Sequence, residues 1–241
     1  MSGMIIHQIL STATGLRELF FPRRCVVCGR VLEAEERDLC GSCIEELPLT
    51  YQWLIPQNAA FERLARRFDV EAAASLFFFG SESDYRHILY GIKYGSRTAL
   101  ARRLGRTLGS YLAQIRDFRK CEAVVPVPLH RLKKWKRGYN QAEEIARGIA
   151  ASLGIPVESR LLARSRYTRT QTRMSVDDKA KNVQGAFRLD DKRCEELKAQ
   201  GVTHVLLVDD VLTTGSTLAS SAAPLQAADF RVSTATLAFV G

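Results

Sequence analysis

A mostly apolar, β-branched run at residues 202–208 constrains the fold more than any other feature of this chain. Such a run is typical of a strand that is buried on both faces in a parallel sheet. It is followed at once by Asp209 and Asp210, then by a segment rich in Thr and Gly, and then by a helix expected from about Ser216. Residues 231–240 alternate as a further strand. This order predicts an α/β domain with a parallel sheet flanked by helices.

A second strand and helix precede this unit. Residues 123–128 form an apolar strand whose two prolines place it at the sheet edge or at the strand exit, because proline cannot donate to a central ladder. A loop is expected next, and then a helix with Asn140 as its N-cap, Glu143 completing a capping box, and Gly154 at its end. Upstream, the patterns predict a strand at 73–79, a short helix at 85–94 and a basic helix at 99–115.

Four of the six cysteines form two Cys-x2-Cys pairs, Cys25 with Cys28 and Cys40 with Cys43. Each pair can fold into a tight knuckle that presents two thiolates to one tetrahedral zinc ion, and Gly29 permits a turn with positive φ. Unpaired buried thiols or a redox pair are the alternatives, and disulfides are the weaker interpretation. Four thiolates leave no open coordination position, so the zinc is expected to be structural.

The chain divides into two expected parts. Residues 1–57 comprise an amphipathic helix between residues 5 and 20, the zinc module, and a proline-containing connection at 47–58. Residues 58–241 form the main α/β domain. No run approaches the roughly 18 consecutive apolar residues of a membrane span, and the N-terminal residues lack the apolar core of a secretory signal. We therefore expect a cytoplasmic protein without membrane insertion.

The chain carries 35 Lys and Arg against 26 Asp and Glu, for a net charge of +9. A basic protein of this kind attracts polyanions, such as nucleic acid or a highly phosphorylated small molecule. The basic residues gather in the middle of the chain, at 86–120, 131–137 and 160–173. A merely solvating basic surface is the alternative.

The segment from Asp209 to Thr217 has the composition of a phosphate-binding loop. In open α/β sheets, ligands bind beyond the carboxyl ends of the strands. Hydroxyl groups are abundant here, Gly215 lets the backbone curl closely around a ligand, and the expected helix points its positive end at the same place. Two adjacent carboxylates would repel a phosphate unless they hold ribose hydroxyls or a magnesium ion. A Walker B element is the rival interpretation, but the chain has no Walker A string to accompany it.

Residues 208–217 resemble the signature with which type I phosphoribosyltransferases bind phosphoribosyl pyrophosphate (PRPP). An ordered series of motifs makes the resemblance closer, and it consists of 126–130, 137–143, Arg164, 170–171 and 182–187, behind the four-cysteine module. Together they resemble the ComF/GntX family of bacterial competence-related proteins over roughly residues 20–241. The resemblance implies a type I phosphoribosyltransferase-like fold, PRPP binding with Mg²⁺, and a role in DNA uptake or utilisation. Pro224 departs from the family pattern and is expected to kink or shorten the last helix.

The resemblance also implies a role for individual residues. Asp209 and Asp210 would be the catalytic pair, holding the ribose hydroxyls and, directly or through water, Mg²⁺. The 5-phosphate would be held by Thr213, Thr214, Gly215, Ser216 and Thr217. The pyrophosphate contacts would come from Arg137, Gly138 and Asn140, with Lys93 reaching the same pocket.

Two functions stay open. The first is an enzyme that displaces pyrophosphate at the anomeric carbon of PRPP, or a retired enzyme that senses PRPP; the sequence indicates no acceptor. The second is a non-enzymatic adaptor that binds single-stranded DNA and a DNA-translocating ATPase, with Trp135 and Tyr139 as stacking platforms. The Arg- and Thr-rich stretch at 164–182 suits either a loop closing over PRPP or a strap for nucleic acid.

Overall fold

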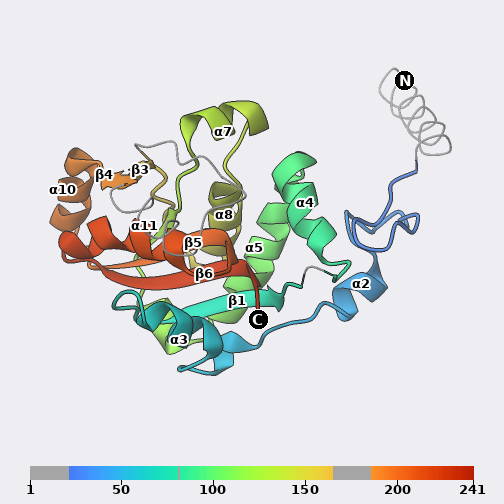
Figure 1. Cartoon of the computed structure of the whole chain (residues 1–241), viewed down its shortest axis with the longest axis horizontal. Coiled ribbons are helices and arrows are strands. Elements are labelled where there is room, and N and C mark those ends of the chain that lie inside the picture. Colours follow the sequence, from blue (N-terminus) through green and yellow to red (C-terminus); the bar gives the residue numbers. More distant parts are fainter. Residues whose placement is uncertain (1–21, 81, 165–185) are drawn as a thin grey trace, which may run out of the picture.

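The computed structural model describes residues 22–80, 82–164 and 186–241. Its centre is a four-stranded parallel sheet with the strand order β1-β6-β5-β2 (Figure 1). The strands are β1 (Ala73–Phe78), β2 (Ala123–Pro126), β5 (His204–Leu212) and β6 (Arg231–Phe239). The predicted α/β class with a parallel sheet is therefore confirmed, and the proline-containing strand β2 lies at the edge, as expected.

Alternate side chains of β5 enter two separate hydrophobic cores, one on each face of the sheet. Leu206 and Val208 belong to the first core, whereas Val205 and Leu207 belong to the second, and all four are fully buried. This double burial explains why the strand has so few polar positions. The first core is covered by α4 (Arg86–Tyr94), α5 (Thr98–Leu112) and α8 (Gln141–Leu153), and the second by α3 (Ala59–Ala65), α10 (Asp191–Ala199) and α11 (Ser216–Ala227).

Helices α5 and α8 pack closely because glycines lie at their contact. A Cβ atom on Gly105 would lie 2.3 Å from the carbonyl oxygen of Ile145, and one on Gly148 would lie 2.2 Å from that of Arg102. The two backbones therefore touch where a side chain would otherwise separate them. This contact holds the pair as one layer behind the sheet.

The carboxyl end of β5 differs from the expectation. The strand was expected to end before Asp209, but its ladder with β6 continues and pairs Asp209 with Thr236 and Leu212 with Phe239. Asp209 and Asp210 thus lie within a strand, not in the loop that follows it. Because side chains alternate along a strand, the two carboxylates leave the backbone in different directions.

The segment between β2 and α8 also corrects two expectations. The expected loop contains a short helix, α7 (Arg131–Arg137), which lies at the top of the coloured ribbon in Figure 1. Helix α8 starts after Asn140 and ends at Gly154 with φ 70°, as predicted, but Asn140 makes no capping bond. Its Nδ2 donates to the carbonyl of Val127 at 3.0 Å instead, so the side chain ties the start of the helix to the exit of β2.

Pro224 lies inside α11 and does not end it early, because the helix continues to Ala227. The loss of one backbone donor affects only the last turn, and the fully buried Leu225 anchors that turn in the core. Further elements that were not predicted from the sequence are α2 (Gly41–Glu45), α3, α6 (Arg116–Arg119), α10, and the antiparallel pair β3 (Leu162–Arg164) and β4 (Phe187–Leu189).

The segment expected to be a plain connection at 47–58 lies against the sheet. Leu49 forms an antiparallel bridge with Phe77, the short 3-10 helix η1 (Gln52–Leu54) follows, and Trp53 stacks on Tyr111 with ring centroids 4.5 Å apart. Asn58 caps α3 through the N–H groups of its first turn. The helix expected between residues 5 and 20, and nearly all of the stretch 164–182, lie outside the described residues. Over the part of the chain that is described, no helix is long and apolar enough to cross a membrane.

Candidate functional site

The four paired cysteines converge on one point. The Sγ atoms of Cys25, Cys28, Cys40 and Cys43 all lie within 4.8 Å of one another, and those of Cys28 and Cys40 are 3.7 Å apart. A regular tetrahedron with Zn–S bonds of about 2.3 Å has S–S edges of about 3.8 Å, so the donor set fits a zinc ion. The predicted ligands of a structural zinc are thus brought together from the turn at Cys25–Cys28 and from the start of α2.

The local backbone holds the turn of this cluster and favours the thiolate form of Cys25. Gly29 has φ 73°, as the first Cys-x2-Cys turn requires, and the N–H of Cys40 donates to Sγ of Cys25 at 3.4 Å. Burial raises the pKa of the Cys25 thiol, but the N–H groups of Cys28, Cys40 and Val27 outweigh it and bring that pKa to about 7. A thiolate is the form that zinc binds.

The zinc module is fastened to the main sheet through α4 and α5. Asp38, which has φ 60°, accepts from Arg97 at 2.7 Å and also pairs with Arg103. The hydroxyl of Tyr85 donates to the carbonyl of Cys43 at 3.2 Å, and burial raises the pKa of this phenol to about 12. These contacts tie the segment of the second cysteine pair to α4 and α5.

A second site lies at the carboxyl ends of β2 and β5. It is a cavity of about 310 Å³ whose lining includes Asp209, Asp210, Lys93, Arg137 and Asn140. Nζ of Lys93 lies 3.2 Å from Oδ2 of Asp210. Two carboxylates on one strand therefore meet cations delivered by α4 and α7.

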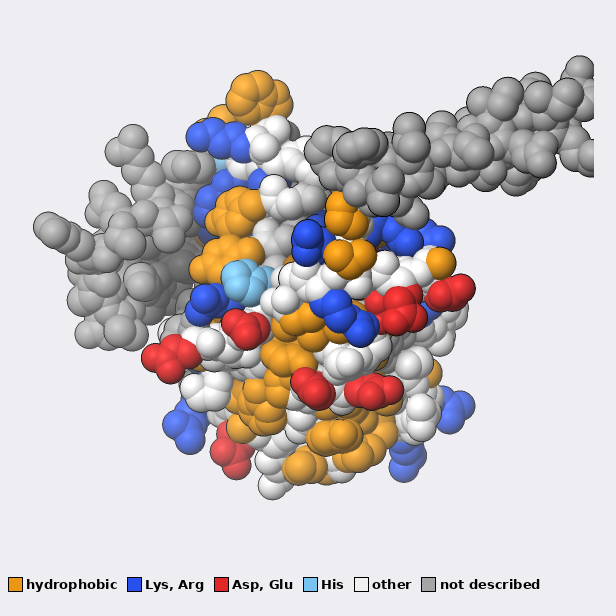
Figure 2. Space-filling view, turned by 90° about the vertical axis from the view of Figure 1, so that its right-hand side faces the viewer, with side chains coloured by type: hydrophobic (Ala, Val, Ile, Leu, Met, Phe, Trp, Pro, Cys, Tyr) orange, Lys and Arg blue, Asp and Glu red, His pale blue; other side chains and the backbone are white. Residues whose placement is uncertain are grey.

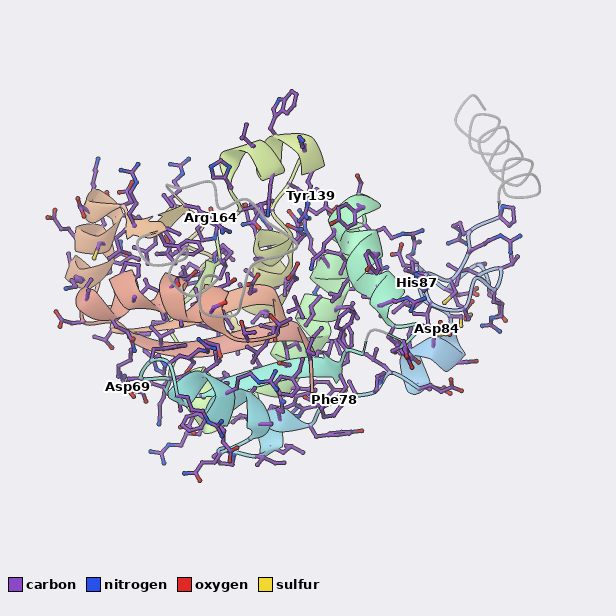
Figure 3. All side chains as sticks on the ribbon, in the orientation of Figure 1. Asp69, Phe78, Asp84, His87, Tyr139 and Arg164 are labelled. Carbon is purple, nitrogen blue, oxygen red and sulfur yellow. The ribbon has the colours of Figure 1, made fainter. Side chains whose placement is uncertain are left out.

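The acidic and basic groups of this cavity shift each other's pKa values. Burial and the neighbouring Asp210 raise the pKa of Asp209 to about 7, while Lys93 and Arg164 oppose the shift. Burial lowers the pKa of Lys133, and the positive charges of Arg164 and its neighbours lower it further. Tyr139 and Arg164 are labelled in Figure 3, where both lie between α7 and the strands β5 and β6. The cavity holds excess positive charge beside one carboxylate that titrates near neutrality.

The loop between β5 and α11 separates this cavity from another. Gly215 has φ 79°, and a Cβ atom there would lie 2.8 Å from Cδ2 of Leu64, so the loop presses against α3. Thr217 lines the cavity of the two aspartates, whereas Thr213 and Thr214 line a separate cavity of about 680 Å³ beside α3. The hydroxyl-rich segment 213–217 therefore contributes side chains to both cavities.

Six of the predicted ligand-pocket residues meet around one cavity, namely Asp209, Asp210, Lys93, Arg137, Asn140 and Thr217. Gly138, Gly215 and Ser216 are not among its lining residues, although Gly138 and Ser216 are next in sequence to residues that are. Sequence reasoning missed Lys133, which the basic run at 131–137 contains. The 3.6-residue period of a helix there could have indicated that Lys133 and Arg137 share a face.

The two aromatic residues expected to stack on bases differ in exposure. The side chain of Trp135 on α7 is 83% exposed. The hydroxyl of Tyr139 instead donates to the carbonyl of Ile92, and the ring is half-buried, so Tyr139 holds α4 and is not an open platform. Tyr90 and Tyr94 of α4 are exposed and have ring centroids 6.3 Å apart, with the Arg137 guanidinium 5.1 Å from the Tyr94 centroid.

Fold and sites together define the class: a zinc-ribbon module joined to a parallel α/β sheet with a charged cavity at its carboxyl edge. A family model described as a double zinc ribbon domain matches residues 16–53, which in this chain contain one set of four cysteines.

Curated relatives match most of the chain. DNA utilization protein YhgH of Salmonella typhimurium is 31% identical over 206 residues, covering 82% of this chain and 82% of that protein. Competence protein F of Haemophilus influenzae is 29% identical over 211 residues, covering 83% of this chain and 89% of that protein. YhgH of Escherichia coli strain K12 is 29% identical over 209 residues, covering 82% of each. The chain belongs to the family of competence protein F and DNA utilization protein YhgH.

Proposed function

We propose that this protein binds PRPP with Mg²⁺ in the cavity at the carboxyl end of β5 and serves in DNA uptake or utilisation. The observation that carries the ligand is the meeting of Asp209 and Asp210 with Lys93 and Arg137 around one cavity. PRPP needs such a mixture, because its ribose offers hydroxyl donors whereas its phosphates need cations. We assign ligand binding to residues 58–241 and the zinc module to residues 1–57.

In this proposal each group has a separate task. Asp209 and Asp210 accept hydrogen bonds from the ribose hydroxyls, and their oxygens are the ligands that Mg²⁺ prefers. Lys93 and Arg137 balance the charge of the pyrophosphate, with Gly138 and Asn140 shaping the turn beside it. Gly215, Ser216 and Thr217 receive the 5-phosphate at the start of α11. Thr213 and Thr214, which the sequence assigned to the same phosphate, line the other cavity. Bound Mg²⁺ would neutralise charge on the leaving pyrophosphate.

If group transfer follows, the bond between the anomeric carbon and pyrophosphate breaks as the acceptor's lone pair forms a new bond to that carbon. The electrons of the broken bond leave with pyrophosphate, where Lys93 and Arg137 stabilise them. No side-chain nucleophile is required.

The biological role rests on the relatives. Their names speak of competence and of DNA utilization, and the net charge of +9 suits work beside nucleic acid. A DNA-translocating ATPase is the partner that such a role calls for.

The test is the thermal unfolding midpoint with and without PRPP and Mg²⁺. At about 100 times its dissociation constant the ligand should stabilise the fold by about 2.7 kcal/mol, or on the order of 5 °C. Asp209→Asn with Asp210→Asn should abolish the shift, whereas Asp117→Asn with Asp229→Asn, a surface change of equal charge, should retain it. No shift in the unaltered protein at millimolar PRPP would contradict the proposal.

One observation favours a second function, the binding of single-stranded DNA. Trp135 is 83% exposed on a helix rich in Lys and Arg. Figure 2 looks onto the right-hand side of the Figure 1 view, and hydrophobic and basic side chains gather at its top, where Figure 1 places α7. Exposed aromatic rings beside cations are what single strands stack on. Trp135→Ala should weaken binding of a fluorescent oligo-dT by about 1 to 3 kcal/mol, and unchanged affinity would remove α7 from this role.

A further inference from the structure

Arg63 of α3, and Arg66 and Arg67 in the turn directly after that helix, lie on the side of the β5–α11 loop that faces away from the two aspartates. Positions 59, 62, 63 and 66 follow helical spacing, so they share one face. That face and the loop enclose the cavity of about 680 Å³, whose lining includes Glu62, Arg63, Arg66, Arg67, Thr213 and Thr214. Three guanidinium groups thus oppose a single carboxylate.

Arg63 has a structural task. Its Nη1 donates to the carbonyl of Thr213 at 2.7 Å and to that of Val240, and its guanidinium lies 4.3 Å from the ring centroid of Phe239. These contacts hold the loop against the end of β6. Arg63 therefore supplies positive charge to the cavity but has little freedom to follow a ligand.

Arg66 and Arg67 are differently placed. Both side chains are exposed, and neither forms an ion pair with another of the described residues. Opposite them, Thr213 and Thr214 are exposed and offer hydroxyl groups. Planar guanidinium groups bind phosphate oxygens in pairs, and hydroxyl donors complete such a site.

The lining of this cavity favours phosphate over a base or an apolar group. None of its lining residues in the described chain is aromatic, so a nucleobase would find no ring to stack on. The cavity could accommodate several phosphate groups in a row. We propose that Arg66, Arg67, Thr213 and Thr214 form a second anion site for consecutive phosphate groups, separate from the cavity of Asp209 and Asp210.

The test measures binding of inorganic tripolyphosphate by calorimetry. Arg66→Gln with Arg67→Gln should weaken this binding at least tenfold, because it removes the two exposed guanidinium groups that form no ion pair with another described residue. Arg116→Gln with Arg119→Gln removes two exposed arginines from α6 and should leave the affinity unchanged, which controls for net charge.

A competing oligo-dT identifies the natural source of the phosphates. If the oligonucleotide displaces tripolyphosphate from the unaltered protein, the site serves a nucleic-acid backbone, and if it does not, the site serves a free polyphosphate. Equal affinities of the Arg66 and Arg67 double variant and the α6 double variant for tripolyphosphate would overturn the proposal. The thermal shift with PRPP and Mg²⁺ should persist in the Arg66 and Arg67 variant, so failure of the second site and failure of the PRPP proposal are distinguishable.

Discussion

Nζ of Lys93 lies 3.2 Å from Oδ2 of Asp210, and this ion pair joins the last turn of α4 to the end of β5. The Lys93 side chain is 24% exposed and that of Asp210 is 13% exposed, so water screens the pair only in part. The neighbouring Asp209 has a raised pKa because of its burial and of the negative charge of Asp210. The lysine therefore offsets two carboxylates that would otherwise repel each other.

Replacing Lys93 by Met should destabilise the protein at pH 7.5 by about 1 to 2 kcal/mol, between the values typical of exposed and buried pairs. It should also raise the pKa of Asp209 further, because Lys93 now lowers it. Urea unfolding measures the first effect. Lys198→Met is the matched control, since its partner Asp229 is 91% exposed, and an equal loss there would rule out a special role for Lys93.

The raised pKa of Asp209 predicts a pH dependence of folding. In the folded protein this carboxyl titrates at about 7, well above its ordinary value of 3.8, so between these values the folded state binds more protons than the unfolded chain. Its contribution to stability is therefore present at low pH and is lost as the pH rises toward and through 7. Asp209→Asn should gain stability relative to the unaltered protein on going from pH 5 to pH 8. Parallel pH profiles of the two would show that the carboxyl titrates normally.

Loss of the first cysteine pair should remove the metal. Cys25→Ser with Cys28→Ser leaves two thiolates, which are too few to hold a structural zinc, and we expect the module to unfold locally. Metal analysis of the purified chain gives the zinc content directly. Cys121→Ser with Cys194→Ser changes two cysteines outside the cluster and should retain one zinc per chain. A full zinc complement in the Cys25 and Cys28 variant would refute the ligand assignment.

Gly215 lies where the β5–α11 loop packs against α3, and its substitution by Ala should destabilise the protein. Gly215→Ala faces both a φ of 79° and Cδ2 of Leu64 at 2.8 Å, so we expect a loss of about 2 to 4 kcal/mol. Gly201→Ala meets a similar φ of 82° but no atom within 4 Å, so only the backbone strain of about 1 kcal/mol applies. Thermal unfolding compares them. An equal loss of stability in the two variants would mean that the side chain of Leu64 moves aside without cost.

Local patterns carried most of the correct predictions. Spacing alone placed the four zinc ligands, because each Cys-x2-Cys knuckle is closed by a few neighbouring residues. The buried strand β5 and the glycine end of α8 were equally local. The capping bond of Asn140 was predicted wrongly because its amide found a distant carbonyl, that of Val127. Helix α7 was missed because a run this basic has hardly any apolar stripe to mark its period.

The sequence by itself determined the α/β class, the zinc cluster and the order of the motifs, because these follow from neighbours along the chain. Only the tertiary structure decided that Lys93 faces Asp210, that Arg63 holds the carbonyl of Thr213, and that the loop separates two cavities. Those contacts depend on the strand order and on how helices pack over the sheet. Packing depends on the shapes of surfaces far apart in the chain, which no spacing rule encodes.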